Sequence, residues 1–236
     1  MPVPTDGDTL IAKMTTHSPG RFEPIPDARP NDSAAPPMVW PPTATQLTGQ
    51  VVELSPCIPE RDAPLLFDAL RGDAVWQHMP GRPQSARSYA QSLAQRIAEG
   101  RFTWVVRLLE PYAELAAGSV VGTSSYMDIS VQDARLEIGA TAYARSVWAS
   151  KVNPDTKLLL LTHAFETLHV GRVQLKTDVR NVRSQQAIAR LGAHFEGTLR
   201  RHQRRDDGTV RDSVLFSITV EEWPGVRDGL LARLNA

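Results

Sequence analysis

The chain of 236 residues has one cysteine, no excess of either charge and no long apolar run. With Cys57 alone no intrachain disulfide can form, which fits a reducing compartment. Basic and acidic residues number 26 each, so net charge predicts no attraction to nucleic acid or to an anionic membrane. No segment approaches the roughly 20 apolar residues that cross a bilayer. The N-terminus lacks the basic flank and apolar core of a secretory signal. We therefore expect a cytoplasmic protein.

Metal and thiol chemistry are not expected either. Cys57 lies between two prolines, in Ser-Pro-Cys-Ile-Pro, and we interpret it as a small buried apolar side chain rather than a nucleophile. The histidines lack the spacing of metal ligands, and we interpret them as ordinary surface or core residues: His78, His163, His169, His194 and His202. The sequence therefore predicts no metal site.

Proline gathers at one end of the chain. Residues 1–45 hold ten of the eighteen prolines. Because proline removes a backbone donor and fixes φ, this stretch can sustain neither a helix nor a central strand. We interpret residues 1–45 as a flexible extension and residues 46–236 as one folded domain. A functional arm with Val39-Trp40 as its apolar anchor is the alternative.

Hydrophobic periodicity and turn residues predict an α/β domain with a mixed sheet. The expected strands cover residues 50–54, 102–108, 119–126, 135–143, 172–177, 194–199 and 213–220. The expected helices cover residues 61–70, 85–100, 153–168 and 181–191. The resulting order is β-α-α-β-β-β-α-β-α-β-β.

The segment from Glu137 to Thr177 is a strand, a loop, a helix and a strand. Asn153-Pro154-Asp155 is typical of a helix start, with Asn153 as the N-cap. A loop entering a helix presents free backbone N–H groups and the positive end of the helix dipole, which suits a phosphate. Gly139 suits a bulge that would splay its strand from the parallel neighbour. Taken alone, such a unit is weak evidence of a site.

Several motifs in this half of the chain resemble the GNAT superfamily of acyltransferases, in particular the branch of ribosomal-protein N-terminal acetyltransferases. The resemblance covers roughly residues 47–223. The motifs are Leu136-Glu137-Ile138-Gly139, His163-Ala164-Phe165, Arg172-Val173-x-Leu175-Lys176-Thr177, Asn181-x-x-Ser184-x-x-Ala187-Ile188-x-x-Leu191-Gly192-Ala193 and Glu196-Gly197-x-Leu199-Arg200.

The resemblance implies a GNAT fold whose sheet is split between the fourth and fifth strands, with acetyl-CoA in the split. It implies that the cofactor is bound by Ile138, Gly139, Ala140, Trp148, Lys151, Val152, Asn153, Asn181 and Ser184, with help from Arg145. Asn181 would bond the pantetheine arm, and Ser184 would lie beside the sulfur. It also makes a homodimer an open alternative, since dimers are common in the family.

Two departures from the family pattern bear on the site. The family's glycine-bearing phosphate loop corresponds here to Trp148, Lys151 and Asn153, which puts close approach of a pyrophosphate in doubt. Lys151 is either a compensating phosphate ligand or a solvated lysine. Ile188 replaces the family's tyrosine acid, and Ser184 is the expected substitute, unless it only caps its helix.

The expected chemistry is direct attack of a primary amine on the thioester. An α-amine with a pKa near 7.8 is about 14% neutral at pH 7, so it needs little help from a base. Glu137 is the candidate base, with a buried structural carboxylate as the equal alternative. The basic run from Arg200 to Arg205 is interpreted as a solvated hairpin arm; it could also attract an acidic acceptor or the cofactor's 3′-phosphate.

Three functions stay open at this point. The favoured one is acetylation of a protein N-terminal α-amine. The second is acetylation of a small amine, such as an antibiotic, a polyamine or an amino-acid derivative. The third is a non-catalytic CoA-binding or regulatory module, which the unusual phosphate loop would explain.

Overall fold

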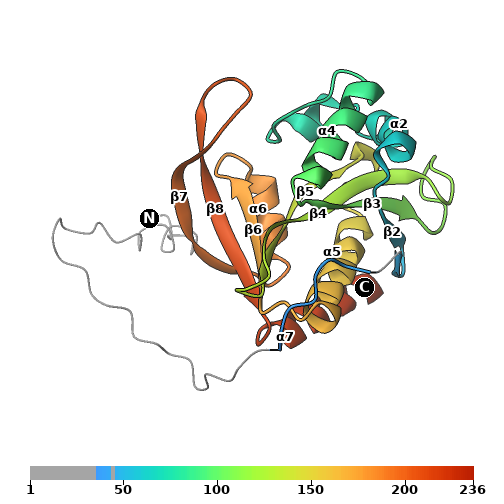
Figure 1. The fold of residues 1–236 in the computed structure, drawn as a ribbon. Helices are drawn as coiled ribbons and strands as arrows, with labels where there is room; N and C mark the ends of the chain where they lie inside the picture. Colours follow the sequence, from blue (N-terminus) through green and yellow to red (C-terminus); the bar gives the residue numbers. More distant parts are fainter. Residues whose placement is uncertain (1–35, 44–45) are drawn as a thin grey trace, which may run out of the picture. The chain divides into compact units, whose positions relative to one another are not determined.

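A mixed eight-stranded sheet is the centre of the fold (Figure 1). The computed structural model describes residues 36–43 and 46–236, so the expected flexible extension lies mostly outside the described residues. The strand order in the sheet is β1-β2-β3-β4-β5-β6-β8-β7. The strands are β1 (Leu47–Thr48), β2 (Val52–Pro56), β3 (Phe102–Leu108), β4 (Val120–Ser130), β5 (Arg135–Tyr143), β6 (Arg172–Asp178), β7 (His194–Arg204) and β8 (Val210–Thr219).

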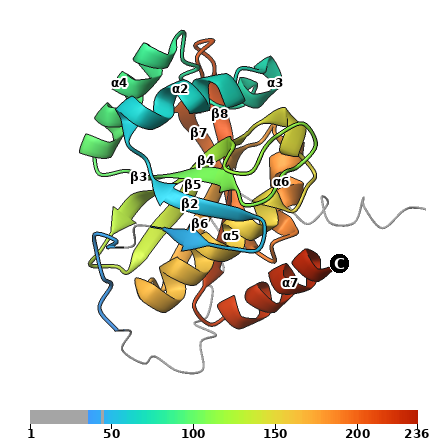
Figure 2. The same cartoon turned by 90° about the vertical axis from the view of Figure 1, so that its right-hand side faces the viewer.

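Helices cover both faces of the sheet, which Figure 2 shows edge on. One face carries α2 (Pro59–Ala69), α3 (Asp73–Trp76) and α4 (Ala86–Ala98) over a smaller apolar cluster that includes Val105 and Ala142. The other face carries α5 (Val152–Thr162), α6 (Val182–Ala189) and α7 (Trp223–Asn235) over the main core, which includes Trp104, Tyr126 and Ile138. Alternate residues of each strand therefore serve two separate cores.

The predicted split of the sheet is confirmed. The parallel strands β5 and β6 pair over three positions only, ending at Glu137 opposite Gln174. Beyond this point β5 continues to pair with β4, and β6 with β8. Six residues of β5 and four of β6 thus run on without pairing to each other.

Helix ends follow their capping residues. Ser85 begins α4 with a capping box to Ser88, and Asn181 caps α6 by accepting the Ser184 N–H at 3.1 Å. Gly192, just beyond α6, has a φ of 91°, a conformation that glycine adopts at little cost. These three capping residues lie where the sequence predicts them.

The prediction for the α5 start was wrong by two residues. The residue before the helix is Lys151, and Asn153 and Pro154 are its second and third residues. The side chain of Ser150 accepts the Val152 N–H at 3.2 Å, so this serine supplies the cap that Asn153 was expected to give. The helix also widens into a π-helical turn at His163–Thr167.

Two short elements, β1 and α3, and the C-terminal helix α7 were not predicted. α7 buries Trp223, Val226, Leu230 and Leu234 against the main core. Its place beside α5 puts the last turn of the chain near the start of α5.

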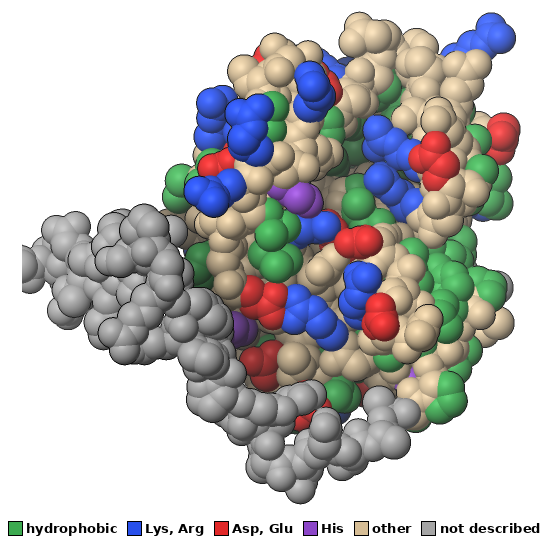
Figure 3. All heavy atoms as spheres, turned by 60° about the vertical axis from the view of Figure 1, so that its left-hand side comes forward, with side chains coloured by type: hydrophobic (Ala, Val, Ile, Leu, Met, Phe, Trp, Pro, Cys, Tyr) green, Lys and Arg blue, Asp and Glu red, His purple; other side chains and the backbone are tan. Residues whose placement is uncertain are grey.

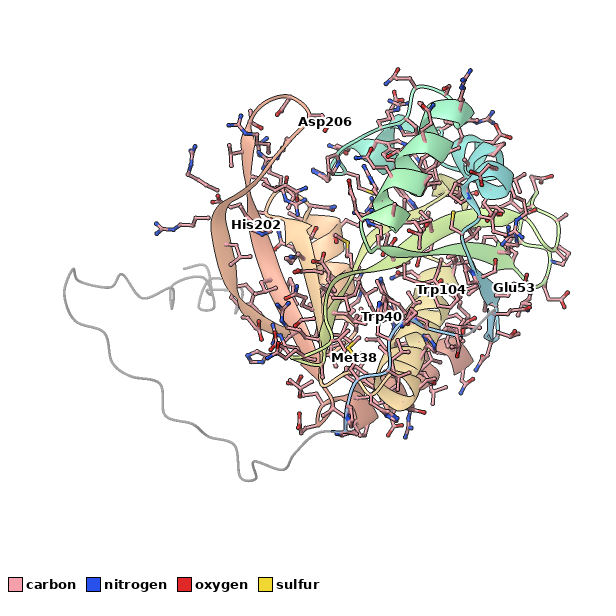
Figure 4. The ribbon with its side chains drawn as sticks, in the orientation of Figure 1. Met38, Trp40, Glu53, Trp104, His202 and Asp206 are labelled. Carbon is pink, nitrogen blue, oxygen red and sulfur yellow. The ribbon has the colours of Figure 1, made fainter. Side chains whose placement is uncertain are left out.

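The segment 36–43 packs on the main core. Met38 is buried, and Trp40 meets Phe102 and Tyr126 edge-on at centroid distances of 6.1 and 6.4 Å. The Val39 N–H donates to the Leu168 carbonyl at 2.8 Å. Figure 4 shows Met38 and Trp40 directed at the sheet and its α5 side. This packing agrees with the alternative of an apolar anchor at Val39-Trp40.

Candidate active site

The backbone of β5 changes direction just after its pairing with β6 ends. Ser125 lies opposite Gly139, but Thr123 lies opposite Ala142, so β5 has one extra residue in this stretch. The residue in the left-handed region is Ala140, with a φ of 47°. The predicted bulge is therefore present, one residue after Gly139. Ile138, Gly139 and Ala140 lie on the part of β5 that has no partner in β6.

The loop between β5 and α5 leaves some of its N–H groups free. The N–H groups of Val147, Trp148, Ser150 and Val152 have acceptors within the loop. The N–H groups of Ala149, Lys151 and Asn153 have no acceptor among residues 36–43 and 46–236. Free N–H groups at the positive end of a helix suit a phosphate.

The left-handed position of this loop is Ala149, with a φ of 60°. Lys151, which stands where the family has glycine, has a φ of −72° and needs no glycine. Its ammonium donates to the Leu234 carbonyl of α7 at 2.8 Å, so it holds the end of that helix. Arg145 is exposed on a short 3₁₀ turn, Arg145–Val147, before the loop.

Trp148 connects the two sides of the split. Its indole N–H donates to the Tyr143 carbonyl at 3.0 Å, at the end of β5. The Arg183 guanidinium, in the first turn of α6, lies over the indole at 3.5 Å from the ring centroid. Since α6 follows β6, this cation–π contact joins the two walls that strand pairing no longer joins. No pattern in the sequence indicates this contact.

Asn181 and Ser184 lie at the start of α6, close to the Trp148–Arg183 contact. The Asn181 side-chain oxygen is used by the cap, which leaves its amide NH₂ without an acceptor among the described residues. Ser184 gives its backbone N–H to that cap, and its hydroxyl is partly accessible. Ile188 is buried in the main core, so it contributes no polar group.

Glu137 lies at the last paired position of β5 and is almost fully buried. Its neighbours Leu136 and Ile138 face α5, so the Glu137 carboxylate faces the opposite side, toward α4. Burial raises the pKa of Glu137, and the Lys176 ammonium at 2.8 Å opposes that increase. A buried carboxylate with a raised pKa is suited to accept a proton near neutral pH.

Lys157 is a buried cation that sequence reasoning missed. It projects from α5 toward β5 and donates to the Thr141 hydroxyl at 3.0 Å, one residue beyond Ala140. No carboxylate of the described residues lies within ion-pair distance of it. Desolvation lowers the pKa of Lys157 to about 7. Its position on the same helical face as Leu160, Leu161 and Ala164 was the available signal.

Polar side chains cover the face of the sheet opposite α5, next to Glu137. Lys176 and Gln174 both contact Asp128, at 3.4 and 2.7 Å. Ser213 of β8 contacts His202 at 3.0 Å and accepts from Arg211 at 2.9 Å. Figure 3 shows this face as a hollow between two lobes, with Lys, Arg, acidic and His side chains at its bottom.

The β7–β8 hairpin and the loop after α3 meet at the rim of the hollow. Asp206 at the hairpin tip accepts the Gly81 N–H at 2.7 Å, and Figure 4 shows it directed at that loop. A cavity of about 190 Å³ lies beneath, lined in part by Trp76, His78 and Asp178. Asp178 is bound through both oxygens by Arg205, at 2.6 and 2.9 Å. Arg205 thus belongs to an ion pair, whereas Arg200, Arg201 and Arg204 are exposed as expected for a solvated arm.

A larger cavity of about 520 Å³ lies on another side of the phosphate-loop candidate. Its lining includes Gln50, Leu108, Tyr112 and Lys151. No residue of β6 or α6 lines it, so it is separate from the place where the strands part.

Other groups are structural. Burial raises the pKa of Cys57 to about 12, as expected of a buried thiol that is not activated. His163 is a core residue, 3.1 Å from the Tyr126 hydroxyl, and burial lowers its pKa. Within residues 36–43 and 46–236, no cluster of His, Cys, Asp and Glu could hold a metal ion, and no helix is long and apolar enough to span a membrane.

Comparison with known proteins agrees with this geometry. Residues 52–194 match the family described as acetyltransferase (GNAT) domain. The structure of an assigned acetyltransferase from T. thermophilus is 35% identical, with a TM-score of 0.72 over 83% of this chain and 100% of that one. RimJ from Mycobacterium smegmatis, solved with CoA-disulfide, shares the fold at 23% identity, with a TM-score of 0.65 over 82% of this chain and 95% of that one.

A curated relative from Bacillus licheniformis, the uncharacterized N-acetyltransferase p20, is 24% identical over 171 residues. The match covers 70% of this chain and 90% of the relative.

Proposed function

Since the chain belongs to the GNAT family of acetyltransferases, we propose that it transfers an acetyl group from acetyl-CoA to a primary amine, the α-amine of a protein N-terminus. The transfer takes place by direct attack of the amine in a ternary complex. The single observation behind this proposal is the parting of β5 and β6 after three paired positions. The parting leaves one edge of each strand free beside the start of α5.

Residues on both walls of the split would hold the acyl donor. On β5, Ile138, Gly139 and Ala140 offer backbone groups that have no β6 partner. An extended ligand with amide groups can pair with such an edge as a strand does. On the other wall, the free NH₂ of Asn181 suits a carbonyl of the pantetheine arm. The N–H groups of Ala149, Lys151 and Asn153 suit the pyrophosphate.

The lysine expected at the phosphates is engaged elsewhere. Lys151 donates to the Leu234 carbonyl, so its backbone N–H, and not its ammonium, is the group we assign to the pyrophosphate. Arg145 and Arg183 are the nearest exposed cations of the split. Either guanidinium can approach a phosphate with two donors.

Glu137 is proposed as the base. It faces the polar hollow, where an acceptor can approach, and it stands at the position where the two strands part. The amine nitrogen bonds to the acetyl carbon, the carbon–sulfur bond breaks, and the amine proton passes to Glu137 directly or through water. Ser184 is proposed to donate a hydrogen bond to the departing sulfur. A positioned base adds typically 10²–10⁴-fold to the rate.

The choice of an α-amine rests on proton chemistry and on fold similarity. At pH 7 about 14% of an α-amine is neutral, compared with about one part in 2,500 of a lysine side chain. A buried carboxylate such as Glu137 can deprotonate the first far more readily than the second. The likeness to the fold of RimJ supports the same choice.

Two measurements test the proposal. Calorimetric titration with acetyl-CoA should show one site per chain, and thiol release should require an added peptide with a free N-terminus. The same peptide with a blocked N-terminus is the control and should give no thiol. Undetectable acetyl-CoA binding at millimolar concentration, or no thiol release with any amine, would overturn the proposal.

A further inference from the structure

Three cations surround Glu137 on the polar face of the sheet, and they come from three different strands or their ends. Arg101 directly precedes β3, Lys176 lies on β6, and Arg211 lies on β8. Arg101 alternates with Thr103 and Val105, which face the α2–α4 side. The three cations therefore share the side of the sheet that holds the hollow.

Arg101 is a half-buried guanidinium with no acidic partner. Among the described residues no carboxylate lies within 4.0 Å of it, and no acceptor receives a hydrogen bond from it. Its pKa is lowered by burial and by the neighbouring Arg96, while the charge of Glu137 opposes that decrease. Arg101 is thus close enough to Glu137 to feel its field, but it is not bonded to it.

Arg211 is in a similar state. Its Nε–H donates to the Ser213 hydroxyl at 2.9 Å, and its other donors have no acceptor in the described part of the chain. Burial lowers its pKa, and Asp178 and Glu137 oppose that decrease. Asp178 is already occupied, because Arg205 binds both its oxygens.

The acids at this place do not balance the cations. Glu137 and Asp128 are the two carboxylates, and Lys176 contacts both, at 2.8 and 3.4 Å. His202 adds no compensating charge, since burial and the nearby Lys176 and Arg211 lower its pKa. Three cations against two carboxylates leave one positive charge in excess, on two guanidinium groups with free donors.

Removing a guanidinium from water without an acidic partner is unfavourable. Its planar array of donors matches a carboxylate or a phosphate. The acyl donor's phosphates do not explain this pair, because the free N–H groups at the α5 start belong to the loop beyond the far end of β5. Arg101 and Arg211 instead face the place from which an acceptor reaches Glu137.

We infer that the acceptor carries an anionic group, a carboxylate or a phosphate, near its amine, and that Arg101 and Arg211 bind this group while the amine lies at Glu137. This inference rests on the proposed function. Two sources share this chemistry: a small amine with its own acid group, and a peptide N-terminus followed by an acidic side chain.

Matched acceptor pairs test the inference in the wild-type enzyme. A peptide beginning Ala-Asp-Glu is compared with one beginning Ala-Asn-Gln, and free aspartate is compared with its diamide. We expect kcat/KM from thiol release to favour the anionic member of one pair by about 10-fold or more, the range of a hydrogen bond to a charged group. The favoured pair identifies the source. The preference should shrink as the salt concentration is raised from about 50 to about 500 mM.

Substitutions then assign the preference to residues. Arg101→Met and Arg211→Met keep the apolar stem and remove the donors, and Arg200→Met, on the exposed hairpin, is the matched control. Each of the first two should reduce the preference roughly 10-fold, chiefly through KM, and the control should not. Acetyl-CoA binding by calorimetry shows that each variant is folded.

The outcomes separate the two proposals. Equal kcat/KM for both members of both pairs, or a preference that survives both substitutions, would overturn the inference while thiol release still supports the proposed function. Absence of thiol release with every amine would instead overturn the proposed function itself.

Discussion

The Lys176 ammonium lies 2.8 Å from the Glu137 carboxylate, across the point where β5 and β6 stop pairing. The contact links the two strands through side chains one step beyond their last backbone pair. It also makes the protonation of the proposed base depend on a residue of the opposite wall.

Replacing Glu137 by Gln should lower kcat about 100-fold or more at pH 7, within the usual range for a general base. The deficit should shrink above about pH 8, because the α-amine then loses its proton without a base. Steady-state thiol release from pH 6 to 9 measures both effects. Glu99→Gln, at the exposed end of α4, is the control. A pH-independent deficit would contradict the role of base and indicate a structural carboxylate.

Replacing Lys176 by Met should shift the acid limb of the kcat/KM profile to higher pH. Lys176 lowers the pKa of Glu137, so its removal lets burial raise that pKa further. The base is then protonated, and inactive, over a wider acidic range. The measurement is the pH–rate profile of the variant against wild type. An unchanged acid limb would show that Glu137 is not the group that titrates.

Two substitutions of Asn181 separate its two roles. Asn181→Asp keeps the oxygen that accepts the Ser184 N–H but removes the free NH₂. Asn181→Ala removes both. We expect both variants to bind acetyl-CoA about 10-fold more weakly, while only the alanine variant loses about 1 kcal/mol of stability with the cap. Calorimetry and urea unfolding give the two numbers, and full affinity in Asn181→Asp would refute the contact with the pantetheine arm.

Replacing Lys157 by Met should stabilise the protein at neutral pH. The folded-state pKa of Lys157 is about 7, below its ordinary value of 10.5. Between these values the unfolded chain binds more protons, so wild-type stability rises with pH. The advantage of the variant is therefore largest below pH 7 and disappears toward pH 10.5. Urea unfolding of both proteins at pH 6, 8 and 10 tests this; a constant difference would contradict it.

Asp155 ties the start of α5 to β2. Its carboxylate is fully buried and accepts the Val51 and Val52 N–H groups at 2.7 and 3.0 Å. Asp155→Ala removes two hydrogen bonds to a charged group and should cost about 3 kcal/mol or more of unfolding free energy. The exposed Asp133→Ala is the control. Equal urea midpoints for the two variants would show that this contact is dispensable.

Much of the fold was predictable because its elements carry local signals. Alternation marks the strands, and Ser85, Asn181 and Gly192 mark helix ends where the structure has them. The C-terminal helix also had a signal, since Trp223, Val226, Leu230 and Leu234 recur at helical spacing after a proline-bearing start. It was overlooked because it lies beyond the motifs of the family.

The site was less predictable, because its contacts join residues far apart in the chain. The family pattern assigns the ammonium of Lys151 to the phosphates, but the carbonyl of Leu234 takes it. No local pattern indicates that Arg183 reaches Trp148, or that Arg101 and Arg211 have no acid beside them in the described part of the chain. These relations depend on which strands are neighbours, a property of the whole sheet.

The stacking of Arg183 on Trp148 turns the split into a slot that is closed at both ends, by backbone pairing at one and by the stack at the other. A long, flexible donor with a bulky nucleotide at one end cannot be threaded through such a slot lengthwise. It has to be laid in from the side, after the indole and the guanidinium separate. The fluorescence of Trp148 should therefore change at the step that admits the donor, and the lifetime of this single contact sets a limit on how fast spent coenzyme leaves.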